Sequence, residues 1–346
     1  MVNTMDMKEM LLALTDTMSV VGFEYYDEEK LTTLLSPYFD EHDYDPVGNH
    51  IFIRRCGKEN AKRLMIDVHY DEVGLMVKDI TKDGYLRVCS MGGTDARVYP
   101  ASEVVVYGKE KMAGIVLTKP VELMTEEEKG KLVPTGEILI DAGLSKEEAE
   151  ELAPIGTPIG YRYEPTALLG DLISVKGLDD KCAAVPVIDA ISRLDMAALC
   201  CDIYFSFSAR EEVGHRAVSA AAYRIAPDMA IVIDVTFGAV PGGDKNLEVE
   251  LGKGLSLSLT AHLDAALAEA ILETAKKHEI PVRPVVEGTG TGTHADDIVY
   301  CAGGIPTVLV SIPVWFMHAP IETLSMKDLG YMSDLLYAFI TDKFGA

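Results

Sequence analysis

The 346-residue chain contains 48% hydrophobic residues, which is enough for a large core and for one or two domains. Its formal net charge is -24, and such a surface repels nucleic acid and anionic membranes, so neither is expected as a partner. The sequence contains no apolar run of about 18 residues, which predicts that the chain has no transmembrane helix.

Six cysteines are spread through the chain without a Cys-x-x-Cys pair, and we expect them to be reduced and mostly buried. One of them, Cys182, is interpreted as a small buried hydrophobic residue. The first residues show no basic segment followed by an apolar one, so no secretory signal is predicted. These features lead us to expect a cytoplasmic protein.

The start of the chain has the pattern of an α/β fold. Apolar residues recur at helical spacing over 6–18, and residues 28–38 resemble a second helix. The apolar run 63–69 predicts a buried strand that ends on His69. Because Asp71 lies two residues further on, the two side chains would point to the same side of an extended chain.

Residues 75–165 have a different texture, because short apolar runs alternate with glycines, and they predict a small β-rich module. Ser145 and Glu148 have the spacing of a capping box, so one short helix is expected inside this module. The charged stretch 123–134 is interpreted as a mobile loop.

From residue 166 onward, strands and helices alternate again. Strands are expected over 171–180, 203–211, 229–234 and 307–314, and helices over 182–194, 217–223, 263–278 and 326–341. This alternation on both sides of the β-rich module predicts an α/β fold in which helices flank a doubly wound, mixed sheet. The predicted domains are a discontinuous α/β domain, 1–74 and 166–346, and an inserted module, 75–165.

Five of the expected strands are followed by residues that can bind a cation: His69 with Asp71, Asp179 with Asp180, Glu211 with Glu212, Asp234, and His318. Ligands collect beyond the carboxyl ends of strands in open α/β sheets. So many carboxylates at one edge would repel each other unless cations lay among them. Imidazole and carboxylate ligands without thiolate suit Zn²⁺, Co²⁺ or Mn²⁺. A pair of metals is the economical arrangement, because one carboxylate can bridge both.

The adjacent carboxylates Glu211 and Glu212 follow an apolar strand. Neighbours in an extended chain point to opposite sides, so one is expected to bind a cation and the other to address a water beside it. An isolated Glu-Glu pair is most often a solvated acidic turn. Three other stretches end their own apolar runs in His or Asp, and they favour the functional interpretation here.

Several motifs, spread over nearly the whole chain, are specific in combination. They are Val47-Gly48-Asn49, His69-x-Asp71-Glu72-Val73-Gly74, Gly92-Gly93, the run from Ile140 to Ala149, Leu178-Asp179-Asp180-Lys181, Glu211-Glu212-Val213-Gly214, Asp234-Val-Thr and His318-x-Pro-x-Glu322. The sequence resembles the dinuclear metallo-aminopeptidases of the glutamyl aminopeptidase and tetrahedral aminopeptidase group. Some relatives in this group have been labelled cellulase or endoglucanase.

The resemblance implies an enzyme that removes N-terminal residues from peptides with the help of two divalent metal ions, Zn²⁺ or Co²⁺, with Mn²⁺ as a further candidate. The metal ligands it implies are Asp179 as the bridge, His69, Glu212, Asp234 and His318. Glu211 would be the general base, Asp71 would orient His69, and Asp180 would support the bridge without binding metal. The inserted module would join subunits into dimers and a larger cage, commonly a dodecamer.

Two positions depart from the family's pattern. Relatives usually have Asp at the position of His294, and Arg-Tyr at the position of Trp315 and Phe316. All three residues are candidates for the substrate pocket or for the layer behind the ligands, and the alternative for Trp315 is a place in the core. Trp cannot pair with a substrate carboxylate as Arg can, so we expect neutral or apolar N-terminal residues to be preferred over Glu or Asp.

Other features of the sequence allow different interpretations. The glycine-rich stretch 288–293 resembles a phosphate loop but has no following Lys-Ser/Thr. His215 and His262 are interpreted as surface or core-edge residues. Glycoside hydrolysis by paired carboxylates needs no metal, and the two histidines at strand ends argue against it. An inactive oligomeric scaffold is the third alternative, although none of the implied ligands or the base is missing.

Overall fold

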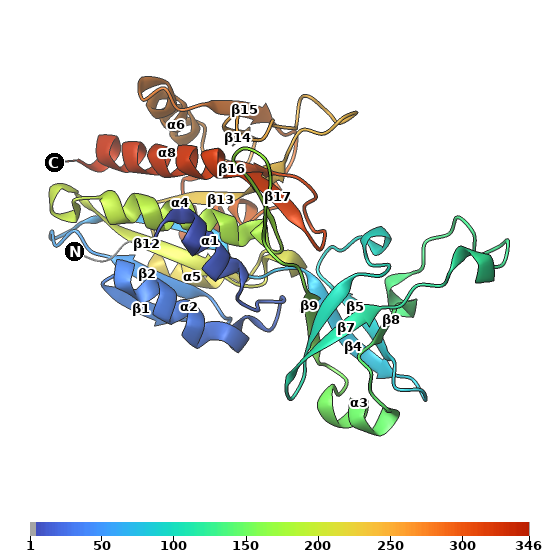
Figure 1. Cartoon of the computed structure of the whole chain (residues 1–346). Coiled ribbons are helices and arrows are strands. Elements are labelled where there is room, and N and C mark those ends of the chain that lie inside the picture. The colour runs from blue at the N-terminus through green and yellow to red at the C-terminus, as the bar shows by residue number, and fades with distance from the viewer. Residues whose placement is uncertain (1–4, 346) are drawn as a thin grey trace.

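The computed structural model describes residues 5–345, and an eight-stranded mixed sheet forms the centre of its larger lobe (Figure 1). The strands lie in the order β1-β2-β12-β3-β13-β16-β14-β15. Their bounds are β1 Glu41–Tyr44, β2 His50–Arg54, β3 Lys62–His69, β12 Cys201–Ser208, β13 Met229–Phe237, β14 Leu255–Leu259, β15 Val282–Val286 and β16 Thr307–Val314. The four central strands, β12, β3, β13 and β16, run parallel, so their carboxyl ends meet at one edge.

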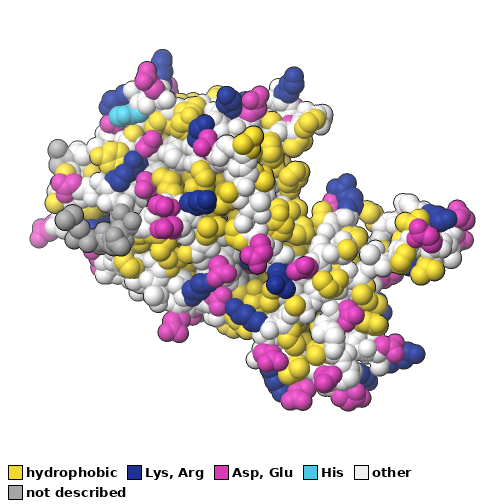
Figure 2. Space-filling view, in the orientation of Figure 1, with side chains coloured by type: hydrophobic (Ala, Val, Ile, Leu, Met, Phe, Trp, Pro, Cys, Tyr) yellow, Lys and Arg dark blue, Asp and Glu magenta, His cyan; other side chains and the backbone are white. Residues whose placement is uncertain are grey.

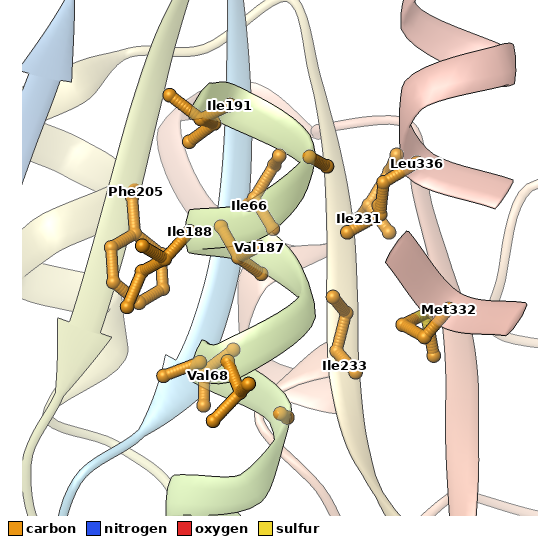
Figure 3. Packing of buried hydrophobic residues seen from close by; sticks show 14 of the residues in the cluster. Ile66, Val68, Val187, Ile188, Ile191, Phe205, Ile231, Ile233, Met332 and Leu336 are labelled. Carbon is orange, nitrogen blue, oxygen red and sulfur yellow. The ribbon is translucent and has the colours of Figure 1, made fainter. Parts of the chain in front are cut away.

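Helices cover both faces of this sheet, as the sequence predicts. One face packs against the helices α1 (Met7–Thr15), α2 (Glu28–Leu35), α4 (Leu178–Arg193), α6 (Ala265–Lys277) and α8 (Met326–Phe344), and the other against α5 (Val218–Ile225) and α7 (Ala295–Ile298). Figure 3 shows Ile66 and Val68 of β3 beneath Val187 of α4. Because side chains alternate along a strand, His69 faces the opposite side, toward α5 and α7.

The second lobe is a closed six-stranded barrel, in the order β4-β5-β8-β7-β6-β9 (Figure 1). Its strands are β4 Gly74–Ile80, β5 Leu86–Met91, β6 Glu103–Tyr107, β7 Lys111–Val116, β8 Leu139–Asp141 and β9 Pro158–Tyr161. The barrel has a core of its own, made of residues such as Val88 and Ile140. Its helix α3 (Lys146–Leu152) begins at the predicted capping box of Ser145 and Glu148, and the stretch 123–134 contains no α-helix or strand.

One expected strand of the main sheet lies elsewhere. The run that precedes Asp179 forms β11 (Leu172–Val175), which pairs antiparallel with β10 (Thr166–Ala167) and β17 (Glu322–Ser325) in a separate three-stranded sheet. A short apolar run predicts a strand but does not tell which partner will accept its hydrogen bonds. Asp179 and Asp180 therefore reach the edge of the main sheet from the first turn of α4.

Over residues 5–345, no helix is long and apolar enough to span a membrane. All six cysteines are free thiols. Residues 1–4, part of the segment in which no secretory signal was predicted, lie outside the described residues. Acidic side chains are scattered over both lobes on the face shown in Figure 2, interspersed with basic ones.

Candidate active site

His69 is the last residue of β3 and lies almost completely buried at the carboxyl edge of the sheet. Its Nδ1 lies 2.9 Å from the backbone oxygen of Asp71, and its Nε2 lies 2.9 Å from Oδ1 of Asp179. A ring that donates from Nδ1 presents a lone pair at Nε2 when it is neutral. The close approach of a carboxylate to Nε2 therefore requires positive charge at this point.

The side chain of Asp71, which the resemblance implies orients His69, lies next to the ring but makes its hydrogen bonds elsewhere. It accepts hydrogen bonds from the backbone N–H groups of Glu211 and Glu212, both at 3.0 Å, and lies 3.8 Å from Nδ1 of His69. The ring is oriented by the backbone oxygen of Asp71 instead. Asp71 thus connects the end of β3 to the turn after β12, through its backbone on one side and its side chain on the other.

Glu211 and Glu212 lie in a 3₁₀ turn, Glu211–Val213, and not in extended chain as expected. Arg210 precedes them in the left-handed conformation, with φ 61°, and this turns the backbone out of the strand direction. Oε1 of Glu211 lies 3.2 Å from Nε2 of His215. Oε2 of Glu212 lies 3.3 Å from Nε2 of His318. The two side chains still reach different partners, which is what their separate roles would require.

Asp179 lies between the two histidines of the cluster. Its Oδ1 contacts His69 at 2.9 Å, and its Oδ2 lies 3.3 Å from Nε2 of His318. Asp234, on β13, is nearly buried and places Oδ1 at 3.9 Å from Nε2 of His69. The structure thus brings together all five residues that the sequence nominated as metal ligands.

Two further carboxylates support this cluster. Oδ2 of Asp180 accepts a hydrogen bond from the backbone N–H of His69 at 3.3 Å. Glu322 accepts one hydrogen bond from the backbone N–H of Asp179 and one from that of His318, at 3.0 and 2.9 Å. The sequence analysis gave Glu322 no role. Its place in the motif, four residues after His318, could have indicated one.

The electrostatics of the cluster call for added positive charge. Burial, followed by neighbouring carboxylates, raises the pKa of Glu211 to about 10 and that of Asp234 to about 7. Burial would lower the pKa of His318, but Asp179 and Glu212 raise it to about 11. Carboxylates that resist ionisation in this way become stable anions when cations lie among them.

The donor set fits divalent cations. His69 forms a compact group with Asp179 and Glu212 and a second one with Asp180 and Asp234, in each of which the ligand atoms lie within 4.8 Å of one another. In the described part of the chain, Oε1 of Glu212 and Oδ1 of Asp180 are buried without a hydrogen-bond partner. Imidazole nitrogens and carboxylate oxygens without thiolate suit Zn²⁺, Co²⁺ and Mn²⁺.

A cavity of about 460 Å³ opens beside the cluster, and its lining includes all the nominated ligands together with Glu211 and His215. His215 is half-buried, which agrees with a place at the edge of the core, and it also lines this cavity. No single-residue signal could have found it, because the turn that points its ring at Glu211 is set by tertiary contacts. The glycine-rich loop 288–293 lies at the same cavity, and His262 contacts the Tyr300 hydroxyl at 3.0 Å.

The three residues that depart from the family's pattern do not line this cavity. The indole N–H of Trp315 donates to the backbone oxygen of Ala239 at 2.9 Å, and the side chain is half-buried. Phe316 is 59% exposed, because its positive φ of 64° turns it away toward a groove beside the barrel. His294 is buried on the α5 and α7 side, where Nδ1 contacts Asp67 at 2.8 Å.

Fold and cluster together define a class: an enzyme of doubly wound α/β architecture with a cluster of histidines and carboxylates, a donor set suited to cations, at the carboxyl edge of its sheet. Residues 48–335 match the M42 glutamyl aminopeptidase family, and the chain belongs to this family. It is accordingly a hydrolase of the exopeptidase type, an aminopeptidase.

Three relatives illustrate the similarity. The chain is 31% identical over 339 residues to a lysyl aminopeptidase of Pyrococcus furiosus, with 96% of each chain covered. It is 29% identical to an aminopeptidase of the archaeon Desulfurococcus kamchatkensis, whose structure superposes with a TM-score of 0.90 over 98% of this chain and 95% of that one. The Pyrococcus horikoshii TET1 peptidase, which can assemble into a tetrahedron or a large octahedral shell, is 29% identical with a TM-score of 0.85, over 97% and 99% of the two chains.

Proposed function

We propose that this aminopeptidase depends on two divalent metal ions, Zn²⁺ or Co²⁺ with Mn²⁺ as a further candidate, and that Asp179 bridges them. The observation that carries this proposal is that the two carboxylate oxygens of Asp179 address two different imidazoles, at 2.9 and 3.3 Å. On one side, His69 and Asp234 would hold the first cation. On the other, His318 and Glu212 would hold the second, since their nitrogen and oxygen lie 3.3 Å apart.

When bound, such a pair of cations supplies a water of lowered pKa and polarises the scissile carbonyl. Glu211 is the group that moves the proton, because its carboxyl lies in the cavity wall and touches none of the nominated ligands at ion-pair distance. It takes a proton from the attacking water and delivers it to the leaving amine. His215, 3.2 Å from its Oε1, helps to hold the carboxyl in place.

The other carboxylates position these groups. Asp71 holds the turn that carries Glu211 and Glu212 by accepting both of their backbone N–H groups. Glu322 does the same for Asp179 and His318. We call these two carboxylates, Asp71 and Glu322, clamps, because each accepts hydrogen bonds from a segment that is distant in sequence. The geometry of the site depends on both.

We further propose that residues 1–74 and 166–346 form the catalytic domain and that the inserted module 75–165 mediates homo-oligomer formation. The assembly of the TET1 peptidase supports this, and so do the large exposed side chains on the module, among them Val121, Leu123 and Leu132. Dimers that build a dodecamer are the expected form. The cytoplasmic location expected from the sequence stays a prediction.

Glycoside hydrolysis is not favoured, because the family is one of aminopeptidases and the carboxylates of the cluster are engaged with histidines. The test is a panel of aminoacyl p-nitroanilides and peptides with blocked and free N-termini, assayed after chelation and after reconstitution with each metal. We expect activity to vanish on chelation, to return with metal and to require a free amine. Full activity of the metal-free protein would refute metal dependence.

A further inference from the structure

The cavity continues beyond the cluster across β16, β14 and β15. Its distal walls are largely apolar and include Phe237, Leu247, Val285 and Leu309. Hydrophobic walls of this kind bind the carbon stem of a side chain, while a few polar groups decide which stem is accepted. The polar groups at this end therefore bear on which N-terminal residue the enzyme takes.

Glu287 is the charged residue at this distal end. It follows β15 directly, and its backbone N–H donates to the backbone oxygen of Leu259 on β14 at 3.1 Å, which fixes its position. Its side chain is half-buried beside Ser258 and contacts none of the histidines of the cluster. Burial and the nearby carboxylate of Asp296 raise the pKa of Glu287, while a hydrogen bond with the Ser258 side chain opposes this shift. Oε2 is buried without a hydrogen-bond partner among residues 5–345.

The distal end of the cavity has no positively charged lining residue in the described part of the chain. Among the lining residues in the described part of the chain there is no lysine or arginine. An acidic substrate side chain would find no lysine or arginine to pair with here and would meet Glu287. An apolar side chain would cover the half-buried carboxylate of Glu287 without giving it a partner, which is costly. A long side chain that ends in a cation satisfies both the apolar walls and the carboxylate.

We propose that Glu287 selects peptides whose N-terminal residue is Lys or Arg, by pairing with the cationic end of that side chain. This inference rests on the proposed aminopeptidase site, which receives the free α-amine and the scissile bond at the other end of the cavity. It agrees with the sequence-based expectation in rejecting Glu and Asp. It replaces the expected neutral or apolar preference, because the Trp315 side chain on which that preference depended lies outside the cavity.

The sharpest test compares lysyl and norleucyl p-nitroanilides with the metal-loaded enzyme, since the two side chains have similar stems and only lysine carries an ammonium. We expect kcat/KM to favour lysine over norleucine by about 10- to 100-fold, as for a charge-assisted hydrogen bond. In Glu287→Gln this ratio should fall to near one. Glu269→Gln, which removes an exposed carboxylate on α6, is the matched control and should leave the ratio unchanged.

A second variant and a binding measurement keep the test independent of turnover. Glu287→Lys should move the preference toward glutamyl p-nitroanilide. Calorimetric titration should show that L-lysine binds more tightly than L-norleucine to the wild type and that Glu287→Gln loses this difference. An unchanged lysine-to-norleucine ratio in Glu287→Gln, or an equal loss for both substrates, would overturn the proposal. If no aminoacyl anilide is hydrolysed after metal reconstitution, the proposed function itself fails.

Discussion

Asp71→Asn tests whether the buried carboxylate behind the Glu211 turn is needed for catalysis. The side chain is fully buried, and each of its oxygens accepts one backbone N–H, from Glu211 and from Glu212. An asparagine has one carbonyl oxygen and one NH₂ group. It can therefore accept a hydrogen bond from only one of the two backbone N–H groups. Its own NH₂ group faces the other N–H, so two donors are placed against each other.

The expected cost follows from these contacts. A buried donor left without an acceptor costs about 1–3 kcal/mol of stability, and the loss of charge weakens the hydrogen bond that is kept. The turn carries the proposed base and a proposed metal ligand, so it relaxes at the point where position matters most. Displacement of about 1 Å at such a site is enough for a loss on the order of 10²-fold, and we expect kcat to fall by that amount.

The control is Asp328→Asn, an equivalent change at a different place. Asp328 is also fully buried and also accepts two backbone N–H groups, from Gly252 and Gly254, but it lies at the start of α8 and does not line the cavity. Thermal unfolding, bound metal and kcat are measured on both variants. Both should lose similar stability, and Asp71→Asn alone should lose activity. Near-normal kcat in Asp71→Asn, or an equal loss in Asp328→Asn, would refute the clamp.

Glu211→Gln should retain the bound metal, measured by elemental analysis, while kcat falls by about 10²- to 10⁴-fold; a near-normal rate would mean that another group carries the proton. His318→Ala and Asp234→Ala should lower metal content together with activity, and metal-replete variants would contradict their place as ligands. Light scattering should find a homo-oligomer that becomes smaller when residues 75–165 are deleted, and a monomeric intact protein would contradict that role. Burial, and to a lesser extent the neighbouring His42, lower the pKa of His50 to about 3. Between this value and the ordinary pKa of about 6.5, His50 binds a proton in the unfolded chain but not in the folded one. The free energy of unfolding therefore falls as pH drops below about 6.5, by about 2 kcal/mol at pH 5. Denaturant unfolding across this range should show a flatter dependence in His50→Phe, and an equal slope in both proteins would exclude His50 as the cause.

The parts of the fold that the sequence predicts are those with a clear period. β3 is buried on both faces, and α8 presents an apolar stripe over nineteen residues, so both elements appear at the expected places. The position of His69 follows from the same logic, because a buried parallel strand must deliver its last residue to the edge of the sheet.

Contacts between distant segments decide what the sequence could not predict. β11 takes β10 and β17 as partners, although its apolar run fits the main sheet equally well. Phe316 adopts a positive φ and turns away from the cavity, although it lies two residues from His318. Glu287 belongs to no motif and enters the cavity because β15 pairs with β14.

The histidine at position 294 is explained by its contact with the buried Asp67. Its Nδ1 contacts Oδ2 of Asp67, whose other oxygen accepts a hydrogen bond from Ser208, and all three side chains are buried under the cluster. An aspartate at position 294 would place a second buried carboxylate against Asp67, and two such anions repel strongly. A histidine at 294 supplies a donor to the same carboxylate. The histidine at 294 therefore matches Asp67 in the layer beneath the proposed ligands, and the residues that we propose to select the substrate lie elsewhere, at the distal end of the cavity.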